Sequence, residues 1–188
     1  MSTDIEIIDV TPRDGLQIEE QVVSTEAKVE LITRLADAGA RRVEAVSFVH
    51  PRLVPTMADA EAVMERVPDR DDVSYIGLAL NAQGILRALD TSVDEVNFVL
   101  PVTDAFAEAN QGGSTGSLLA ELETALPDLE GTGKRLSVTL AVAFGCPYQG
   151  DVPIADVVRI AGTLLDAAPL DELAIADTIG CGVPGQTQ

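Results

Sequence analysis

The sequence is poor in aromatic residues, cysteine and histidine. Aromatic side chains make up 3% of its 188 residues, tryptophan is absent, and His50 is the single histidine. Two cysteines, Cys146 and Cys181, are too few for a disulfide framework. No apolar run approaches the length of a bilayer span, and an apolar run that begins at Ile5 leaves no room for a signal peptide. We therefore expect a cytoplasmic protein that makes no contact with a membrane.

Positive charge is also scarce. The formal net charge is −19, and only Lys28 and Lys134 are lysines, the other ten cations being arginines. Because no basic stripe is available to neutralise phosphates, the composition argues against a nucleic-acid binder. The acidic, lysine-poor balance suits a high-salt cytoplasm, where salt screens self-repulsion, and it suits a mesophile with a GC-rich genome equally well.

The sequence does contain a regular alternation of strand-like and helical patterns. The expected strands are residues 5–10, 43–48, 73–78, 96–100, 136–143 and 173–176. The expected helices are residues 25–38, 58–66, 83–89, 112–129 and 154–167, the first with Ser24 as its N-cap and Gly39 at its end. Strands that alternate with helices indicate a parallel sheet with right-handed crossovers. At this length we expect one α/β domain spanning residues 1–188.

Two α/β architectures accommodate six such units. A doubly wound dinucleotide-binding sheet would want a Gly-x-Gly-x-x-Gly turn after the first strand, but the turn here reads Pro-Arg-Asp-Gly-Leu-Gln. Polar candidates instead recur at the carboxyl ends of strands, where TIM-barrel active sites are built. We therefore predict a TIM (β/α)8 barrel truncated to about six βα units. Without strands seven and eight, the first and sixth strands would be unpaired edges.

The stretch around Arg13 and Asp14 is the strongest candidate for chemistry. Residues 5–10 have the β-branched composition of a strand buried on both faces, and Pro12 ends that strand because proline donates no ladder hydrogen bond. Gly15 then lets the backbone turn. A guanidinium beside a carboxylate at the end of a buried strand can hold an oxyanion and a metal ion side by side. On spacing alone, an ordinary surface Arg–Asp pair in a βα loop explains the pattern equally well.

The stretch Thr-Pro-Arg-Asp-Gly-Leu-Gln at 11–17 resembles the first-strand signature of the 3-hydroxy-3-methylglutaryl-CoA (HMG-CoA) lyases, which are metal-dependent TIM-barrel enzymes. The resemblance extends from about Ile5 to Gly185. Its further segments are residues 23–25, 43–49, 51–57, 145–150 and 176–180. Pro12 and the Leu16-Gln17 pair favour the lyases over the Claisen-type synthases of the same superfamily. Those synthases usually carry Leu-Arg-Asp-Gly followed by an acidic residue.

The resemblance implies roles for a set of polar residues. It places Arg13, Asp14 and Glu44 in the catalytic cluster, with Asp14 as a metal ligand and Arg13 beside the carbonyl or enolate oxygen of the substrate. The implied substrate-binding residues are Arg13, Ser47, Asn110, Asp177 and Thr178, and we add Gln17 because it lies close enough to Arg13 in sequence to line the same pocket. Family members often carry lysines just before the asparagine that corresponds to Asn110, whereas this chain has Glu108-Ala109.

Plainer structural roles remain open for several of these residues. Arg13 could simply form a salt bridge with Asp14 or Glu44, and Asp14 could cap the turn that follows it. Ser47 could be a solvated residue at the end of its strand, and Asp177 could form an Asx-turn.

The resemblance further implies a divalent cation, Mg²⁺ or Mn²⁺, an acyl-CoA substrate and a homodimer. In the family, a His-x-His pair on the seventh strand completes the metal site, whereas His50 lies in a proline-rich loop, where a solvated side chain is typical. We therefore expect Asp14 to be the one metal ligand in this chain and the chain alone to be inactive. Cys146 lies in a motif similar to that of the reactive lyase cysteine but follows the fifth strand. We expect a plain buried or loop cysteine there and a small packed one at Cys181.

The activity implied by the resemblance is cleavage of HMG-CoA, or of a close analogue, to acetoacetate and acetyl-CoA by a metal-assisted retro-Claisen reaction. Two alternatives stay open at this point. One is a Claisen-type synthase that joins acetyl-CoA to a 2-oxo acid. The other is a non-catalytic half-barrel that associates with a partner.

Overall fold

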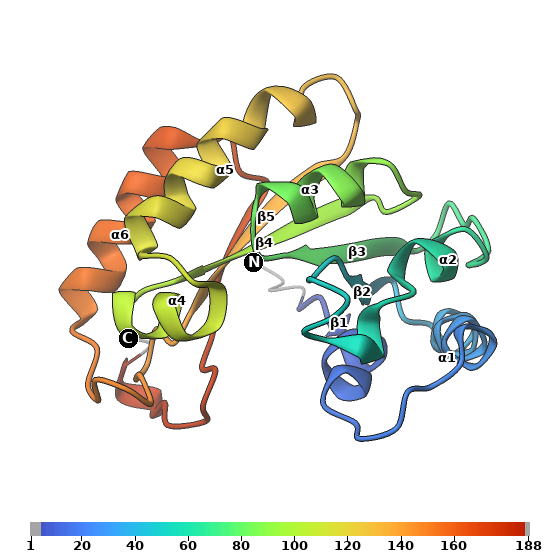
Figure 1. Cartoon of the computed structure of the whole chain (residues 1–188), viewed down its shortest axis with the longest axis horizontal. Helices are drawn as coiled ribbons and strands as arrows, with labels where there is room; N and C mark the ends of the chain where they lie inside the picture. Colours follow the sequence, from blue (N-terminus) through green and yellow to red (C-terminus); the bar gives the residue numbers. More distant parts are fainter. Residues whose placement is uncertain (1–4, 187–188) are drawn as a thin grey trace.

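A computed structural model of the chain describes residues 5–186 and shows six parallel strands in one curled sheet (Figure 1). The strands are β1 (Ile8–Asp9), β2 (Arg42–Ser47), β3 (Ser74–Ala79), β4 (Glu95–Pro101), β5 (Arg135–Ala141) and β6 (Glu172–Ile175). Their order in the sheet follows their order in the chain. Parallel neighbours joined by helical crossovers are the arrangement of a TIM barrel, so the prediction of a partial barrel with six βα units is confirmed.

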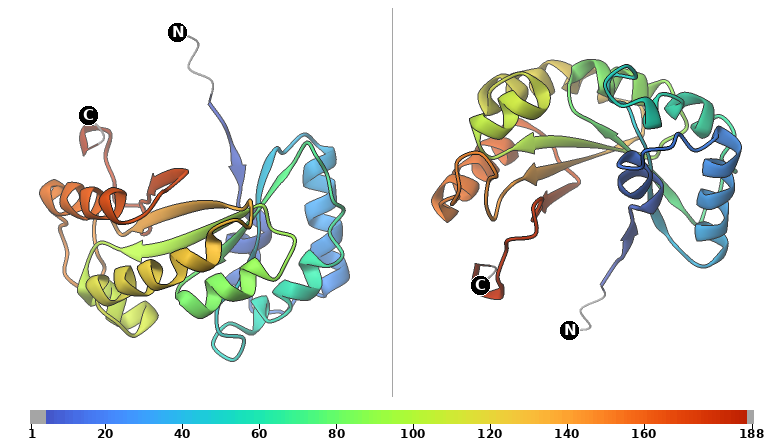
Figure 2. Two further views of the ribbon diagram at one scale, coloured as in Figure 1. Left: turned by 90° about the horizontal axis from the view of Figure 1, so that it is seen from above. Right: turned by 60° about the horizontal axis from the view of Figure 1, so that its bottom comes forward.

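The helices lie along the outer side of the curl (Figure 2). They are α1 (Thr25–Asp37), α2 (Ala60–Met64), α3 (Ala82–Leu89), α4 (Asp104–Gln111), α5 (Thr115–Leu129) and α6 (Ile154–Ala167). Ser24 accepts a hydrogen bond from the Ala27 amide, and Gly39 follows α1 with φ at 106°, so the predicted start and end of the first helix are confirmed. In residues 5–186, no helix is long and apolar enough to span a membrane.

The main core lies between the sheet and these helices. Val96, Phe98 and Leu140 of the strands are fully buried in one cluster with Ile85 of α3 and Leu122 of α5. Removing such side chains from water supplies about 1.5–3 kcal/mol each, which fixes the helices on the outer face of the sheet. The inner face is therefore left to other side chains.

A separate, smaller apolar cluster fixes the turn that follows β1. Val49, Met57 and Leu78 are buried together, and Leu16 packs against them directly after the turn of residues 11–15. This contact anchors the segment that carries Arg13 and Asp14.

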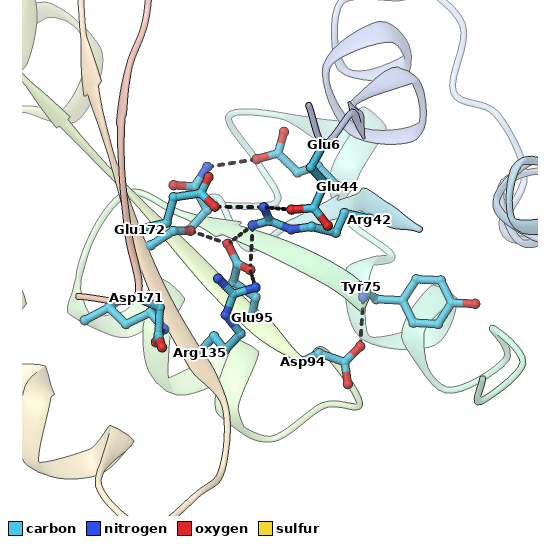
Figure 3. Close-up of polar contacts among 12 residues, drawn as sticks. Glu6, Arg42, Glu44, Tyr75, Asp94, Glu95, Arg135, Asp171 and Glu172 are labelled. Carbon is cyan, nitrogen blue, oxygen red and sulfur yellow. Dashed lines mark hydrogen bonds and ion pairs between the residues drawn. The ribbon is translucent and has the colours of Figure 1, made fainter. Parts of the chain in front are cut away.

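Charged side chains fill the inner face at the amino ends of the strands. Arg42 is the first residue of β2, and it contacts Glu95 (2.8 Å), Glu172 (2.7 Å) and Glu6 (3.0 Å) (Figure 3). Because three strands separate β2 from β6 in the sheet, Arg42 and Glu172 can meet only across the concave face. Burial alone would lower the pKa of Arg42, but hydrogen bonds and charges of these carboxylates hold the pKa above its ordinary value.

Two predictions about secondary structure were wrong. The first strand pairs only at Ile8–Asp9, and Ile5 and Ile7 are 86% and 77% exposed rather than buried on both faces, because β1 has a neighbour on one side only. The helix expected to open at residue 112 begins at Thr115, and the eight-residue helix α4 before it was missed. Gly112, with φ at 76°, separates the two helices.

Candidate active site

Arg13 and Asp14 lie on one tight helical turn at the carboxyl end of β1. The turn is the five-residue π-helix η1 (Thr11–Gly15), in which the Val10 carbonyl accepts the amides of both Asp14 (2.7 Å) and Gly15 (3.4 Å). Pro12 fits at its start because an amide in the first turn would have no intrahelical acceptor. β1 ends at Asp9, one residue before the predicted end, and Arg13 and Asp14 emerge at the edge where barrel active sites are built.

The Arg13 guanidinium lies between two carboxylates. Its Nε and Nη2 atoms lie 2.6 and 2.5 Å from Oε2 of Glu44, and its Nη1 lies 2.8 Å from Oδ1 of Asp14. The side chains of Arg13 and Glu44 are 16% and 3% exposed. The structure thus contains both salt bridges that were the plainer alternative for Arg13. A buried carboxylate requires such pairing, and this pairing in turn fixes the guanidinium at the strand ends.

Glu44 is held from its other side by two residues that the motif analysis did not single out. Asn97 of β4 donates through Nδ2 to Oε1 of Glu44 at 3.1 Å, and Thr139 of β5 donates to Oδ1 of Asn97 at 3.0 Å. A signal for them was present in the sequence. Polar and apolar residues alternate along 95–98 (Glu-Val-Asn-Phe) and 135–140 (Arg-Leu-Ser-Val-Thr-Leu), which indicates strands with one polar face.

Ser47 and Gln17 carry buried polar atoms without partners. Ser47, at the end of β2, is fully buried, and its Oγ has no hydrogen-bond partner in the described part of the chain, which excludes the solvated serine of the plainer explanation. Oε1 of Gln17 is likewise buried and unpaired there, while the Gln17 carbonyl accepts a 2.9 Å hydrogen bond from the Thr56 hydroxyl. Unpaired buried polar atoms are uncommon, and a bound group is one explanation for them.

Asp177 and Thr178 hold the backbone of the loops after β6 and β5. The Asp177 carboxylate accepts the amides of Cys181 and Gly182, both at 2.9 Å, and the Gly182 amide is the main cause of its lowered pKa. These amides lie four and five residues after Asp177, so its side chain closes a wider loop than an Asx-turn, in which the amide two residues on would be bound. Thr178 accepts the amide of Val142 at 2.7 Å. Val142 has φ at 54°, a strained conformation for a β-branched residue, so this hydrogen bond secures an unfavourable turn.

Asn110, Asn81 and His50 lie outside this cluster. Asn110 is an exposed residue of α4, and no contact joins it to Arg13 or Glu44 among residues 5–186. Asn81 caps α3, accepting the Gly84 amide at 2.8 Å. His50 is exposed, as expected, and its Nδ1 accepts the Arg52 amide.

The two cysteines differ in burial. Cys146 is a buried loop cysteine, as predicted. Burial would raise its pKa, but the Thr103 hydroxyl and backbone amides hold that pKa below the ordinary value. Cys181 is exposed, so the expectation of a packed residue was wrong, although its sulfur lies against Gly145. It lies in a loop whose other side chains leave it open to solvent.

The described residues do not by themselves fit a divalent-cation site. Within residues 5–186, no group of three or more His, Cys, Asp or Glu side chains is arranged to hold a metal ion. Asp14, with its side chain 61% exposed, offers one oxygen ligand beside Arg13. One carboxylate seldom holds Mg²⁺ or Mn²⁺ against water, so the metal role of Asp14 remains a prediction.

Comparison with known proteins gives a consistent set of relatives. A sequence profile of the HMGL-like family matches residues 4–188. The chain is 33% identical over 184 residues to hydroxymethylglutaryl-CoA lyase YngG of Bacillus subtilis. This match covers 98% of this chain and 61% of that relative. It is 34% identical over 183 residues to hydroxymethylglutaryl-CoA lyase of Pseudomonas mevalonii, or 97% of this chain and 60% of the relative.

Solved structures agree with these relatives. An HMG-CoA lyase from Acenitobacter baumannii, in complex with coenzyme A and 3-methylmalate, has a TM-score of 0.92 and 33% identity, and the match covers 96% of this chain and 59% of that one. The chain thus spans about 60% of the length of the relatives it matches. Because the family profile covers nearly every residue of the sequence, the chain belongs to the HMGL-like family.

Proposed function

We propose that the protein carrying this chain is a carbon–carbon lyase that cleaves HMG-CoA, or a close analogue, to acetoacetate and acetyl-CoA. The observation that carries the proposal is the placement of Arg13 against Glu44 and Asp14 at the strand ends of an HMGL-like chain. The names of two relatives and the coenzyme A bound to a structural neighbour support the substrate class.

The reaction determines what the site must do. A base removes the proton from the tertiary alcohol of the substrate, the alcohol oxygen becomes the ketone of acetoacetate, and the adjacent carbon–carbon bond breaks. The electron pair of that bond moves into the enolate of acetyl-CoA, which an acid then protonates on carbon. Negative charge therefore grows on the thioester oxygen as the bond breaks. A fixed positive charge next to that oxygen lowers the barrier.

Arg13 is suited to that task because its charge is permanent and its orientation is fixed. Nη1 of Arg13 contacts Asp14 and Nη2 contacts Glu44, each through one of its two N–H groups. Within residues 5–186, the second N–H of each nitrogen has no carboxylate partner and can donate to a substrate oxygen. Glu44 anchors the guanidinium without moving, since its own side chain is nearly fully buried. A pre-oriented donor costs no reorganisation when the oxyanion forms.

The other assignments extend this proposal. Asp14 takes one ligand position of a divalent cation, which when bound would polarise substrate oxygens. The unpaired atoms of Ser47 and Gln17 support their assignment to substrate binding. Thr178 keeps its hydroxyl hydrogen free to donate while it accepts the Val142 amide. Asp177 and Asn110 are assigned to the same task from the family resemblance alone.

The direct test is an assay of the purified full-length protein that carries this chain, with HMG-CoA in the presence of Mg²⁺ or Mn²⁺. The proposal expects acetoacetate and acetyl-CoA in equal amounts. A parallel incubation of acetyl-CoA with a series of 2-oxo acids tests the synthase alternative. Condensation products without cleavage products would overturn the proposal in favour of a synthase, and no turnover in either assay would overturn both.

A further inference from the structure

Polar side chains cross the inner face of the sheet in two layers. The lower layer joins Arg42, Glu95 and Ser137, with the Ser137 hydroxyl 2.6 Å from Oε1 of Glu95. Two residues further along each strand, the upper layer joins Glu44 of β2, Asn97 of β4 and Thr139 of β5. β3 lies between β2 and β4, so both layers pass across it on the concave side.

The upper layer connects directly to Arg13. The two oxygens of Glu44 have different partners, since Oε2 lies against Arg13 and Oε1 accepts the Asn97 amide. With both oxygens held, the carboxylate cannot rotate about its last side-chain bond. Its contact with Arg13 is therefore fixed in direction as well as in distance.

Glu44 and Thr139 together hold the Asn97 amide: the carboxylate can only accept, so it faces the NH₂ group, and Thr139 ties the other end of the amide to β5. The Thr139 hydroxyl donates to Oδ1 of Asn97, so the oxygen of the amide is directed to β5 and its NH₂ group to Glu44. The reverse orientation would bring an amide oxygen against a carboxylate oxygen and lose the hydrogen bond to Glu44, although the Thr139 hydroxyl could then accept from the NH₂ group. Without the Thr139 hydroxyl, the Asn97 amide loses its anchor on β5, and its side chain can move away from Glu44 more easily.

We propose that Asn97 and Thr139 are positioning residues that hold Glu44, and through it Arg13, in the orientation that meets the substrate oxyanion. Neither residue touches the reacting atoms. The inference rests on the proposed lyase function for its consequence in catalysis. Its geometric part, the restraint of Arg13, depends only on the hydrogen bonds that join Thr139, Asn97, Glu44 and Arg13.

The first experiment measures that restraint without any reaction. In ¹⁵N-labelled protein, the Nε hydrogen of Arg13 is identified by its loss in Arg13→Lys, and its exchange with water is followed by NMR. Thr139→Val keeps the shape of the side chain but removes the donor. We expect exchange to be faster by roughly fivefold in Thr139→Val and in Asn97→Leu, the effect of one lost hydrogen bond.

Two controls separate positioning from a general loss of stability. Thr139→Ser retains the hydroxyl and should exchange within about twofold of wild type. Ser137→Ala removes a hydroxyl from the lower layer of the same strand. The exchange rate of the Arg13 Nε hydrogen should therefore stay within about twofold of wild type, even if Ser137→Ala lowers stability. Unchanged exchange in Thr139→Val, or an equal effect in Ser137→Ala, would overturn the proposal.

The second experiment measures catalysis in the full-length protein that carries this chain. Thr139→Val should lower kcat by about tenfold with KM for the CoA thioester changed less than about threefold, because the restraint acts on the transition state. Thr139→Ser should restore kcat. Faster exchange with unchanged kcat would overturn the catalytic role of the restraint. If the wild-type protein cleaves no CoA thioester, the proposed function fails and the NMR result alone decides the geometric part.

Discussion

At the scale of single residues, the pair of Arg13 and Glu44 dominates the site. Glu44 lies inside an apolar strand, where a carboxylate is unfavourable unless it is paired, and the structure provides Arg13 and Asn97 as its partners. The pair is nearly enclosed by protein, so water screens it little.

Glu44→Gln is expected to lower the free energy of unfolding by at least about 2 kcal/mol, because it leaves the largely buried Arg13 with only the exposed Asp14. Chemical denaturation followed by circular dichroism measures this change. Glu30→Gln is the matched control, since both side chains of the Glu30–Arg34 pair are exposed to solvent. This substitution should lower the free energy of unfolding by less than about 0.5 kcal/mol. Equal losses in the two variants would show that burial of the Glu44 pair contributes nothing.

Sequence reasoning found the residues of this pair but missed those that support it. Arg13, Asp14 and Glu44 stand out because charged residues at the end of, or inside, an apolar strand need an explanation. Asn97 and Thr139 are uncharged, and their meaning depends on Glu44 lying two strands away, a neighbour that only the sheet order supplies. The alternation of polar and apolar residues in their strands was the available signal.

At the scale of secondary-structure elements, α3 approaches the backbone directly after β2 closely enough to constrain the sequence. A Cβ at Gly84 would lie 2.9 Å from the carbonyl oxygen of Phe48, directly after the strand that carries Glu44. Only a residue without a side chain allows this distance.

Gly84→Ala is therefore expected to destabilise the fold by about 1–3 kcal/mol, since either the helix or the end of the strand must move. Gly162→Ala is the control, because a Cβ at Gly162 in α6 meets no atom within 4 Å. That change should stabilise the protein by about 0.5–1 kcal/mol through helix propensity. Thermal unfolding of the two variants should shift in opposite directions, and a stabilising Gly84→Ala would contradict the packing described.

Element prediction succeeded where the sequence carries its own stop signals. The fifth expected helix matches α6 at both ends, and Ser24 and Gly39 bound α1 as expected. It failed at β1, since the composition of residues 5–10 indicates a buried strand but burial depends on neighbours that composition does not specify. It failed again at α4, because the helical pattern of residues 104–111 is weak and the glycines that follow indicate the start of the next helix.

At the scale of the whole molecule, the net charge of −19 opposes folding through self-repulsion. Salt screens that repulsion, with a Debye length that falls from about 30 Å at 0.01 M to about 3 Å at 1 M. The thermal midpoint should therefore rise by a few degrees as NaCl increases from about 0.02 M to about 0.5 M. A variant with Glu123→Gln, Asp128→Asn and Glu130→Gln, all exposed positions, should respond less. A midpoint that falls with salt would contradict this account.

The central claim is that Arg13, fixed against Glu44, stabilises the oxyanion that forms when the carbon–carbon bond breaks. The most direct measurement is kcat for HMG-CoA cleavage by the full-length protein with Arg13→Met, which removes the charge and keeps much of the bulk. Arg34→Met, on the exposed face of α1, serves as the control, and circular dichroism verifies that both variants are folded. The account predicts a loss of at least about a hundredfold for Arg13→Met alone. A folded Arg13→Met with kcat within about threefold of wild type would contradict it.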